Sequence, residues 1–132
     1  KEIPEYNVRY EYNSVGYDYD TGLFDMPEIY HQLGQDKESE RILLKLAENA
    51  MQYLNWYNHF SQSRINRIIG NSQRYYIFLS SAVDGLKRCH SSKVGKYEKF
   101  FADLEQTPVG QALIMRLQQE QMQQQYQEYN QE

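Results

Sequence analysis

Few residues of this sequence are spaced as a metal site or a catalytic centre would require. The chain has three histidines, His31, His59 and His90, and a single cysteine, Cys89. The histidines lie far apart, and neither an HExxH motif nor a second cysteine is present, so the pattern of the common zinc sites is missing. Cys89 and His90 are neighbours, and adjacent side chains on a helix do not face each other. We therefore predict no metal ligand, no cofactor and no catalytic residue.

Three other patterns match functional motifs only in part. Residues 18–22, DYDTG, resemble the start of a calcium loop, but the glycine comes one position early and no glutamate stands at position twelve. Glu48 among aromatic residues could serve as a general acid, although many helices contain such a glutamate. Arg74 beside Tyr75 and Tyr76 is a combination that stacks on nucleic-acid bases. The formal net charge of −4 disfavours nucleic acid as a partner.

Charge is distributed unevenly along the chain. Residues 1–28 carry seven acidic and two basic side chains, a net charge of −5, whereas residues 64–99 carry eight basic and two acidic ones, a net charge of +6. Such blocks are usual on solvated faces, but they also favour docking of the acidic segment, or of an anionic partner, on the basic one. We predict a surface for anions or acidic partners made of Arg64, Arg67, Arg74, Lys87, Arg88, Lys93, Lys96 and Lys99.

The first 22 residues are acidic and rich in tyrosine. Over residues 5–12, aromatic and apolar side chains alternate with polar ones, which is typical of a strand, and the following residues 13–16, NSVG, favour a turn. We predict an extended or β-hairpin arm over residues 1–22. Because an extended segment can add to a sheet edge of another chain, we also predict partner-binding side chains on this arm, namely Tyr6, Tyr10, Tyr12, Tyr17 and Tyr19.

The rest of the chain is organised around one long amphipathic stretch, residues 36–60. Its apolar residues recur at intervals of three and four, the spacing of one helix face, and further apolar residues widen this face as in a central helix. Asp36 is a natural N-cap for this helix. The expected inner face consists of Leu43, Leu46, Ala47, Ala50, Leu54 and Tyr57.

Start and stop residues place shorter helices around the central one. A capping box from Asp25 to Glu28 begins a short helix that Gly34 ends. A kinked pair of helices, Ser63–Ile69 and Ser72–Arg88, follows, then a helix after Ser92 and another after Thr107-Pro108. The fold class is therefore a mainly α bundle of four or five helices, with an arm (1–22), a helical domain (23–118) and a Gln-rich tail (119–132) that either frays or protrudes as a helix towards a second chain.

These features favour a non-enzymatic protein–protein interaction module or an accessory subunit of a larger assembly. The partner is another protein or a second copy of the chain. The alternative is a small helical enzyme or ligand-binding bundle built on the aromatic residues of the central helix, Tyr53, Trp56, Tyr57 and Phe60. No apolar run reaches the length of a membrane span. The chain begins with Lys1, as expected of a processed secreted or periplasmic chain or of an excised fragment, whereas a single cysteine is more typical of the cytoplasm.

Overall fold

The protein is mainly helical over the residues that the computed structural model describes, 24–130. The mainly α prediction is confirmed over this range, whereas the predicted arm with its five tyrosines lies outside the described residues. The helices are α2 (Asp25–Gln32), α3 (Asp36–Tyr57), α4 (Gln62–Arg67), α5 (Ile69–Arg88), α6 (Val94–Leu104) and α7 (Pro108–Asn130).

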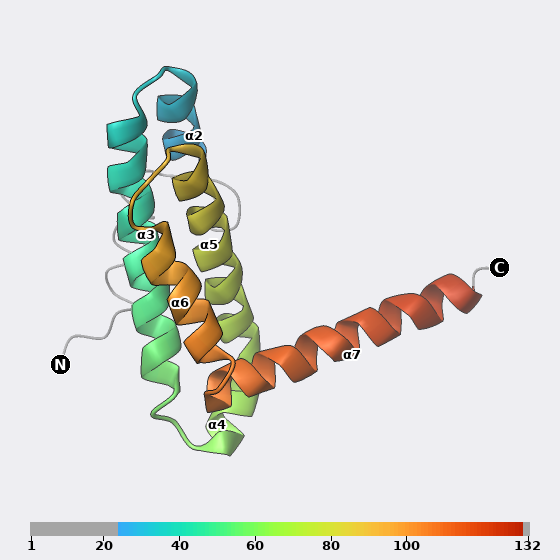
Figure 1. The fold of residues 1–132 in the computed structure, drawn as a ribbon. Helices are drawn as coiled ribbons and strands as arrows, with labels where there is room; N and C mark the ends of the chain where they lie inside the picture. The colour runs from blue at the N-terminus through green and yellow to red at the C-terminus, as the bar shows by residue number, and fades with distance from the viewer. Residues whose placement is uncertain (1–23, 131–132) are drawn as a thin grey trace.

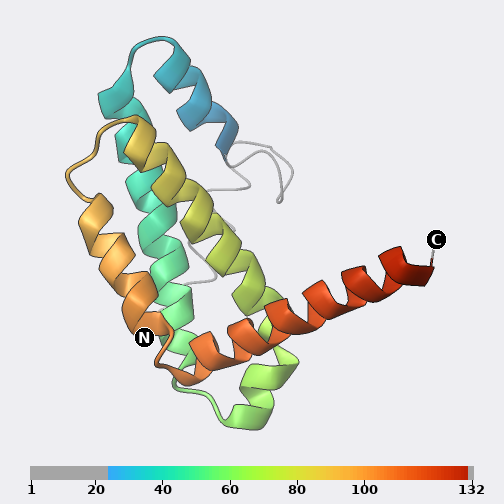
Figure 2. The ribbon, with the colours of Figure 1, turned by 45° about the vertical axis from the view of Figure 1, so that its right-hand side comes forward.

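The long helices α3 and α5 lie side by side, run in opposite directions and form the centre of the bundle (Figures 1 and 2). Helix α2 packs on α3 at the end where α5 finishes, and the Ser39 hydroxyl joins the two by donating a buried hydrogen bond of 2.7 Å to the Pro27 carbonyl oxygen. Helix α6 then runs back along the bundle towards α4. The central helix is therefore α3, and it ends three residues before the predicted Phe60.

The inner face of α3 differs from the predicted face at two positions. Leu46 is only half-buried, and Tyr53, which lies outside the predicted stripe, is 0 % exposed. The reason lies in α5, because the Tyr53 ring stacks on Tyr75 of that helix with centroids 4.0 Å apart. The fully buried face of α3 thus turns towards α5, and Leu46 is left on its flank.

The predicted break between the fourth and fifth helices is present, but it lies earlier than the Gly70-Asn71-Ser72 sequence. The chain leaves helical geometry at Ile68, with φ −99° and ψ 13°, and α5 begins at the next residue. Ser72 does not cap a helix, because it lies inside α5 and is 0 % exposed. Ser61, in contrast, caps α4 by accepting a hydrogen bond from the Arg64 backbone N–H.

Helices α2 and α5 end in the same way. At each end a residue with positive φ, Gly34 (75°) or His90 (56°), follows the last turn. The N–H of the next residue then bonds back to a carbonyl five residues earlier, Gln35 to Tyr30 and Ser91 to Leu86. This is the Schellman arrangement, which glycine adopts without strain and histidine does not. Gly34 ends α2 as predicted, whereas the sequence did not predict that His90 would end α5.

Two predicted acidic N-caps, Asp25 and Asp36, are wrong, because the preceding residue stands at the N-cap position of each helix. Phe24, not Asp25, occupies the N-cap of α2 without a side-chain hydrogen bond, so no capping box forms. Gln35 occupies the N-cap of α3, and Asp36, the first residue of that helix, instead accepts a hydrogen bond from His31.

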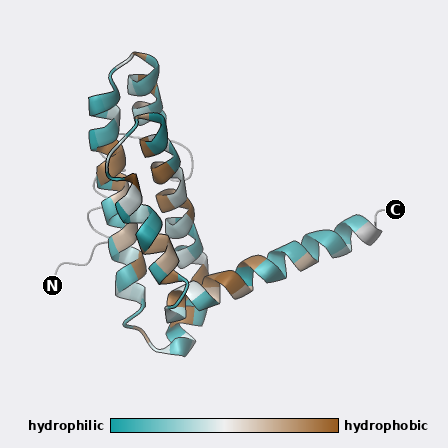
Figure 3. Cartoon of the chain, viewed as in Figure 1, coloured by the Kyte–Doolittle hydropathy of each residue, from teal (hydrophilic) through white to brown (hydrophobic). Residues whose placement is uncertain are grey.

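Helix α7 begins as predicted at Thr107-Pro108 and then leaves the bundle. The Thr107 hydroxyl accepts the Gly110 N–H (3.1 Å), and the Asn58 side chain at the end of α3 accepts the Val109 N–H (2.9 Å). Val109 and Leu113 are buried at the root of the helix. Beyond this root α7 projects away from the other helices (Figures 1 and 2), and its ribbon changes from hydrophobic to mostly hydrophilic residues (Figure 3).

Candidate functional site

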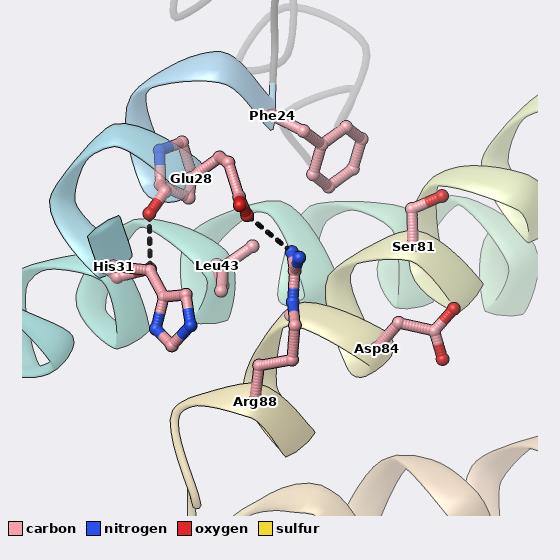
Figure 4. A pocket seen from close by; sticks show the side chains of 10 residues that line it. Phe24, Glu28, His31, Leu43, Ser81, Asp84 and Arg88 are labelled. Atoms are coloured by element: carbon pink, nitrogen blue, oxygen red, sulfur yellow. Dashed lines mark hydrogen bonds and ion pairs between the residues drawn. The ribbon is translucent and has the colours of Figure 1, made fainter.

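A cleft of about 470 Å³ opens where α2, the start of α3 and the end of α5 meet. Figure 4 shows acidic, basic and aromatic side chains around one opening. Its floor is formed where α3 and α5 approach closely, because a Cβ on Gly85 would lie 2.8 Å from a Leu43 methyl carbon. The lining residues are Phe24, Pro27, Glu28, His31, Ser39, Leu43, Ser81, Asp84, Gly85 and Arg88.

An ion pair crosses this cleft. The Arg88 guanidinium of α5 lies 2.7 Å from a carboxylate oxygen of Glu28 on α2 (Figure 4). Glu28 belongs to the acidic segment and Arg88 to the basic one, so this contact is of the kind that the charge pattern favours. Both side chains are partly exposed to water, and such a pair contributes no more than about 1 kcal/mol to stability.

A second cluster lies beside the cleft and combines three donor types. His31 comes from the last turn of α2, Asp36 from the first turn of α3, and Cys89 is the C-cap of α5. The His31 Nδ1 lies 2.8 Å from the Asp36 Oδ1. One donor atom from each residue lies within 4.8 Å of the other two, and all three residues are partly buried.

Sequence reasoning missed this cluster because it looked for metal ligands and catalytic pairs only among residues that are close together in the sequence. The spacing of His31 and Asp36 across a helix end at Gly34 was a local clue, since a tight turn brings residues on either side of it together. Cys89, however, is distant in sequence, and its place depends on how α5 packs.

Glu48 does not have the protonation behaviour of a general acid. It accepts hydrogen bonds from Lys96 and from the Tyr97 hydroxyl (2.6 Å), and these tie α3 to α6. Burial opposes ionisation, but the two hydrogen bonds and the Lys96 charge outweigh it and hold the pKa of Glu48 below its ordinary value. Burial, followed by the hydrogen bond and charge of Glu48, raises the pKa of Tyr97 well above its ordinary value. At neutral pH the carboxyl is therefore ionised and the phenol is neutral.

The predicted basic residues are all exposed but do not form one patch. Helix α4, with Arg64 and Arg67, lies at the end of the bundle opposite the C-terminal end of α5, which carries Lys87 and Arg88 (Figure 1). Arg64 also lies over the Phe60 ring, 4.0 Å from its centroid. Arg74 lies in the first half of α5, Lys93 is the N-cap of α6, and Lys96 and Lys99 lie within α6. Binding of an acidic partner by these residues stays a prediction, as does partner binding by the tyrosines of the arm.

The aromatic residues of the central helix pack against one another and against α5. Tyr53 and Tyr75 are stacked, and the rings of Trp56 and Phe60 meet edge to face with centroids 4.9 Å apart. None of the four residues of the predicted aromatic pocket, Tyr53, Trp56, Tyr57 and Phe60, lines the cleft. The described cleft lies instead towards the other end of α3.

The projecting part of α7 carries exposed apolar side chains. Met115 is 60 % exposed, and Met122 and Tyr126 are each 69 % exposed. On the bundle side of the same helix, Glu120 accepts hydrogen bonds from Gln73 of α5 at 3.1 and 3.3 Å. The predicted boundary between domain and tail at residue 119 therefore falls inside one continuous helix.

No family model, no curated protein and no solved structure matches this chain. None of the described helices, from α2 to α7, has the length and apolar character needed to cross a lipid bilayer.

Proposed function

We propose that this protein is a non-enzymatic protein–protein interaction module that presents helix α7 to a second copy of itself. The observation that carries the proposal is the apolar stripe of Met115, Met122 and Tyr126 on the projecting part of α7. Exposed apolar groups that share one helix face commonly mark an interaction surface.

The stripe lies on the side of α7 that faces away from the bundle. At 100° per residue, positions 115, 122 and 126 fall within about 40° of one another around the helix. Leu113, which is buried, is rotated from Met115 by about 160°. The side of α7 that packs on the bundle and the side that carries the stripe are thus nearly opposite, so docking of a second helix leaves the root of α7 undisturbed.

The composition of this part of α7 favours an identical partner. Seven of the ten residues from 118 to 127 are Gln, whose side chain both donates and accepts hydrogen bonds and therefore complements itself. Only Glu120 and Glu128 are charged between residues 118 and 130, and Glu120 already contacts α5. Two copies consequently meet with little repulsion between like charges.

Sedimentation equilibrium of the full chain tests the proposal, with Met122→Glu as the variant and Gln124→Glu as its matched control. Both substitutions add one negative charge to the same exposed stretch, but position 124 lies about 200° around the helix from position 122. A buried Met contributes about 1.5–3 kcal/mol relative to an exposed one, so Met122→Glu should raise the dimer dissociation constant at least tenfold. Gln124→Glu should change it less than about threefold.

Two results would overturn the proposal. One is a native chain that stays monomeric at about 100 µM, because a dimer with a dissociation constant of about 1 µM would then be largely associated. The other is an equal increase of the dimer dissociation constant in the two glutamate variants. Equal increases would mean that the copies do not meet through the stripe, or that the added negative charge alone weakens the dimer. Far-ultraviolet circular dichroism checks that both variants keep the helical fold.

The cleft between α2, α3 and α5 favours a second candidate function, the binding of a small molecule. Its volume of about 470 Å³ lies within the range of ligand pockets, and Phe24, Glu28 and Arg88 offer aromatic, acidic and basic contacts. Thermal shifts of the native chain with a diverse set of small molecules test this candidate. A shift that Arg88→Gln abolishes would support it, and the absence of any shift would exclude binding by the tested classes.

A further inference from the structure

We propose that His31, Asp36 and Cys89 form a binding site for a divalent transition metal ion of the zinc type. The proposal concerns the opposite end of the bundle from the root of α7 and is independent of self-association. It rests on the meeting of three helix ends, where one donor atom of each residue lies within 4.8 Å of the other two.

The donor types select the class of metal. Thiolate sulfur, imidazole nitrogen and carboxylate oxygen are the three ligand groups that Zn²⁺ takes in proteins. Hard cations such as Mg²⁺ and Ca²⁺ prefer oxygen ligands alone and would leave His31 and Cys89 unused. The cluster contains one donor of each type, so it suits Zn²⁺ or Co²⁺ and not the hard ions.

The distances require only small side-chain movements. Zinc bonds of about 2.0–2.3 Å in a tetrahedron hold neighbouring donor atoms roughly 3.3–3.8 Å apart. The His31–Asp36 contact of 2.8 Å is slightly shorter than this, and the 4.8 Å limit on the three donors is slightly longer. The His31 and Asp36 side chains are 31 % and 42 % exposed, so both retain room to rotate.

The backbone around the cluster is fixed by hydrogen bonds at each helix end. His31 and Cys89 stand just before the Schellman turns at Gly34 and His90 that end α2 and α5, and Asp36 opens α3 two residues after Gly34. A metal bound here would join the short helix α2 to both central helices. Three protein ligands would leave a fourth coordination position for water, and His31 also lines the neighbouring cleft.

Binding changes the protonation of the site in a defined way. The metal takes the Cys89 side chain as thiolate, so the thiol proton passes to the buffer. His31 binds as neutral imidazole, with its proton on the ring nitrogen that does not bind the metal. Asp36 binds as carboxylate. The metal keeps its oxidation state throughout, and the site needs no other reactant.

Titration of the metal-free full chain with Co²⁺ tests the proposal, because thiolate ligation gives a sulfur-to-cobalt charge-transfer band that histidine and carboxylate alone do not. We expect this band to saturate at one equivalent, and Zn²⁺ to displace the Co²⁺. Cys89→Ser should abolish the band. His31→Gln should weaken Co²⁺ binding by at least about tenfold, because losing even a residue that only hydrogen-bonds to a metal ligand weakens metal binding by about 10–100-fold. His59→Gln, an exposed histidine just beyond the other end of α3, is the control and should bind as the native chain does.

Thermal unfolding gives a readout that does not depend on cobalt spectra. Zn²⁺ in excess should raise the Tm of the native chain and of His59→Gln, because a ligand that binds only the folded state stabilises it. It should leave the Tm of Cys89→Ser unchanged. The proposal is overturned if the native chain gives no charge-transfer band with Co²⁺, or if Cys89→Ser binds Zn²⁺ with native affinity. Since the first of these outcomes uses the native protein alone, it holds even if a variant fails to fold.

Discussion

Replacing Gly110 by alanine tests the corner that sets the direction of α7. Gly110 lies in the first turn of α7, close to the end of α6. A Cβ at this position would lie 1.8 Å from the carbonyl oxygen of Leu104 and 2.6 Å from its carbonyl carbon. Ordinary van der Waals contact begins at 3.4 Å, so Gly110→Ala would have to move the two helix ends apart by about 1.6 Å.

The neighbouring atoms cannot give way cheaply. The Leu104 carbonyl accepts hydrogen bonds from both the Thr107 N–H (2.9 Å) and the Thr107 hydroxyl (2.7 Å), and it is backbone, not the end of a flexible side chain. Overpacking costs about 1–3 kcal/mol and sometimes more, whereas alanine gains about 0.5–1 kcal/mol over glycine in a helix. We expect a net loss of about 2 kcal/mol in the free energy of unfolding, or roughly 6–10 °C in Tm for a domain of this size.

Urea unfolding followed by circular dichroism measures this loss, and Gly95→Ala is the matched control. Gly95 also lies in the first turn of a helix, α6, but a Cβ there meets no atom within 4 Å. The control should unfold with unchanged stability or with a gain of up to about 1 kcal/mol. If Gly110→Ala proved as stable as Gly95→Ala, the close approach of α6 and α7 would be refuted, and with it the direction in which α7 leaves the bundle.

Three further predictions concern the core, a helix end and the partly exposed contact of Glu48. Leu54→Ala should cost about 2–5 kcal/mol of unfolding free energy because Leu54 is 0 % exposed, whereas Ile77→Ala, at a position 52 % exposed, should cost less than about 1 kcal/mol in the same urea titration. His90→Gly should raise the unfolding free energy by about 1 kcal/mol, since glycine adopts the φ of 56° without strain; an unchanged urea midpoint would argue against that conformation. The folded-state pKa of Glu48 is lowered, so its stabilisation is present above the unfolded value of about 4.3 and is lost as the pH falls through the folded value. The Tm advantage of the native chain over Glu48→Gln should therefore shrink on acidification below about pH 4.3, and an advantage that stays constant down to strongly acidic pH would contradict this.

Local sequence signals were sufficient for most of the secondary structure. The three- and four-residue spacing of apolar side chains predicted α3, and Gly34 and Thr107-Pro108 marked a helix end and a helix start, because these residues act on the backbone within one turn. The same local reasoning misassigned Asp36 as a cap. Its carboxylate has a competing partner, His31, which only the turn at Gly34 brings near.

The candidate sites depend on contacts that no local pattern contains. Cys89 approaches His31 and Asp36 only because α5 packs against α3 and ends beside α2. Leu46 and Tyr53 have similar apolar surroundings in sequence. Helix α5 nevertheless buries Tyr53 fully and leaves Leu46 half-buried on the flank of α3.

The sequence by itself determined that the described part of the chain is mainly helical, where most of its helices lie, and that the last stretch after Leu117 has little apolar surface to bury. Only the tertiary structure decided which side of α7 packs on the bundle and which side carries the exposed stripe of Met115, Met122 and Tyr126. The physical reason is that helix formation depends on residues within one or two turns of each other. The face that a helix buries depends instead on the shape of whatever packs against it, and for α7 this is the corner made by Asn58, Leu104 and Gly110.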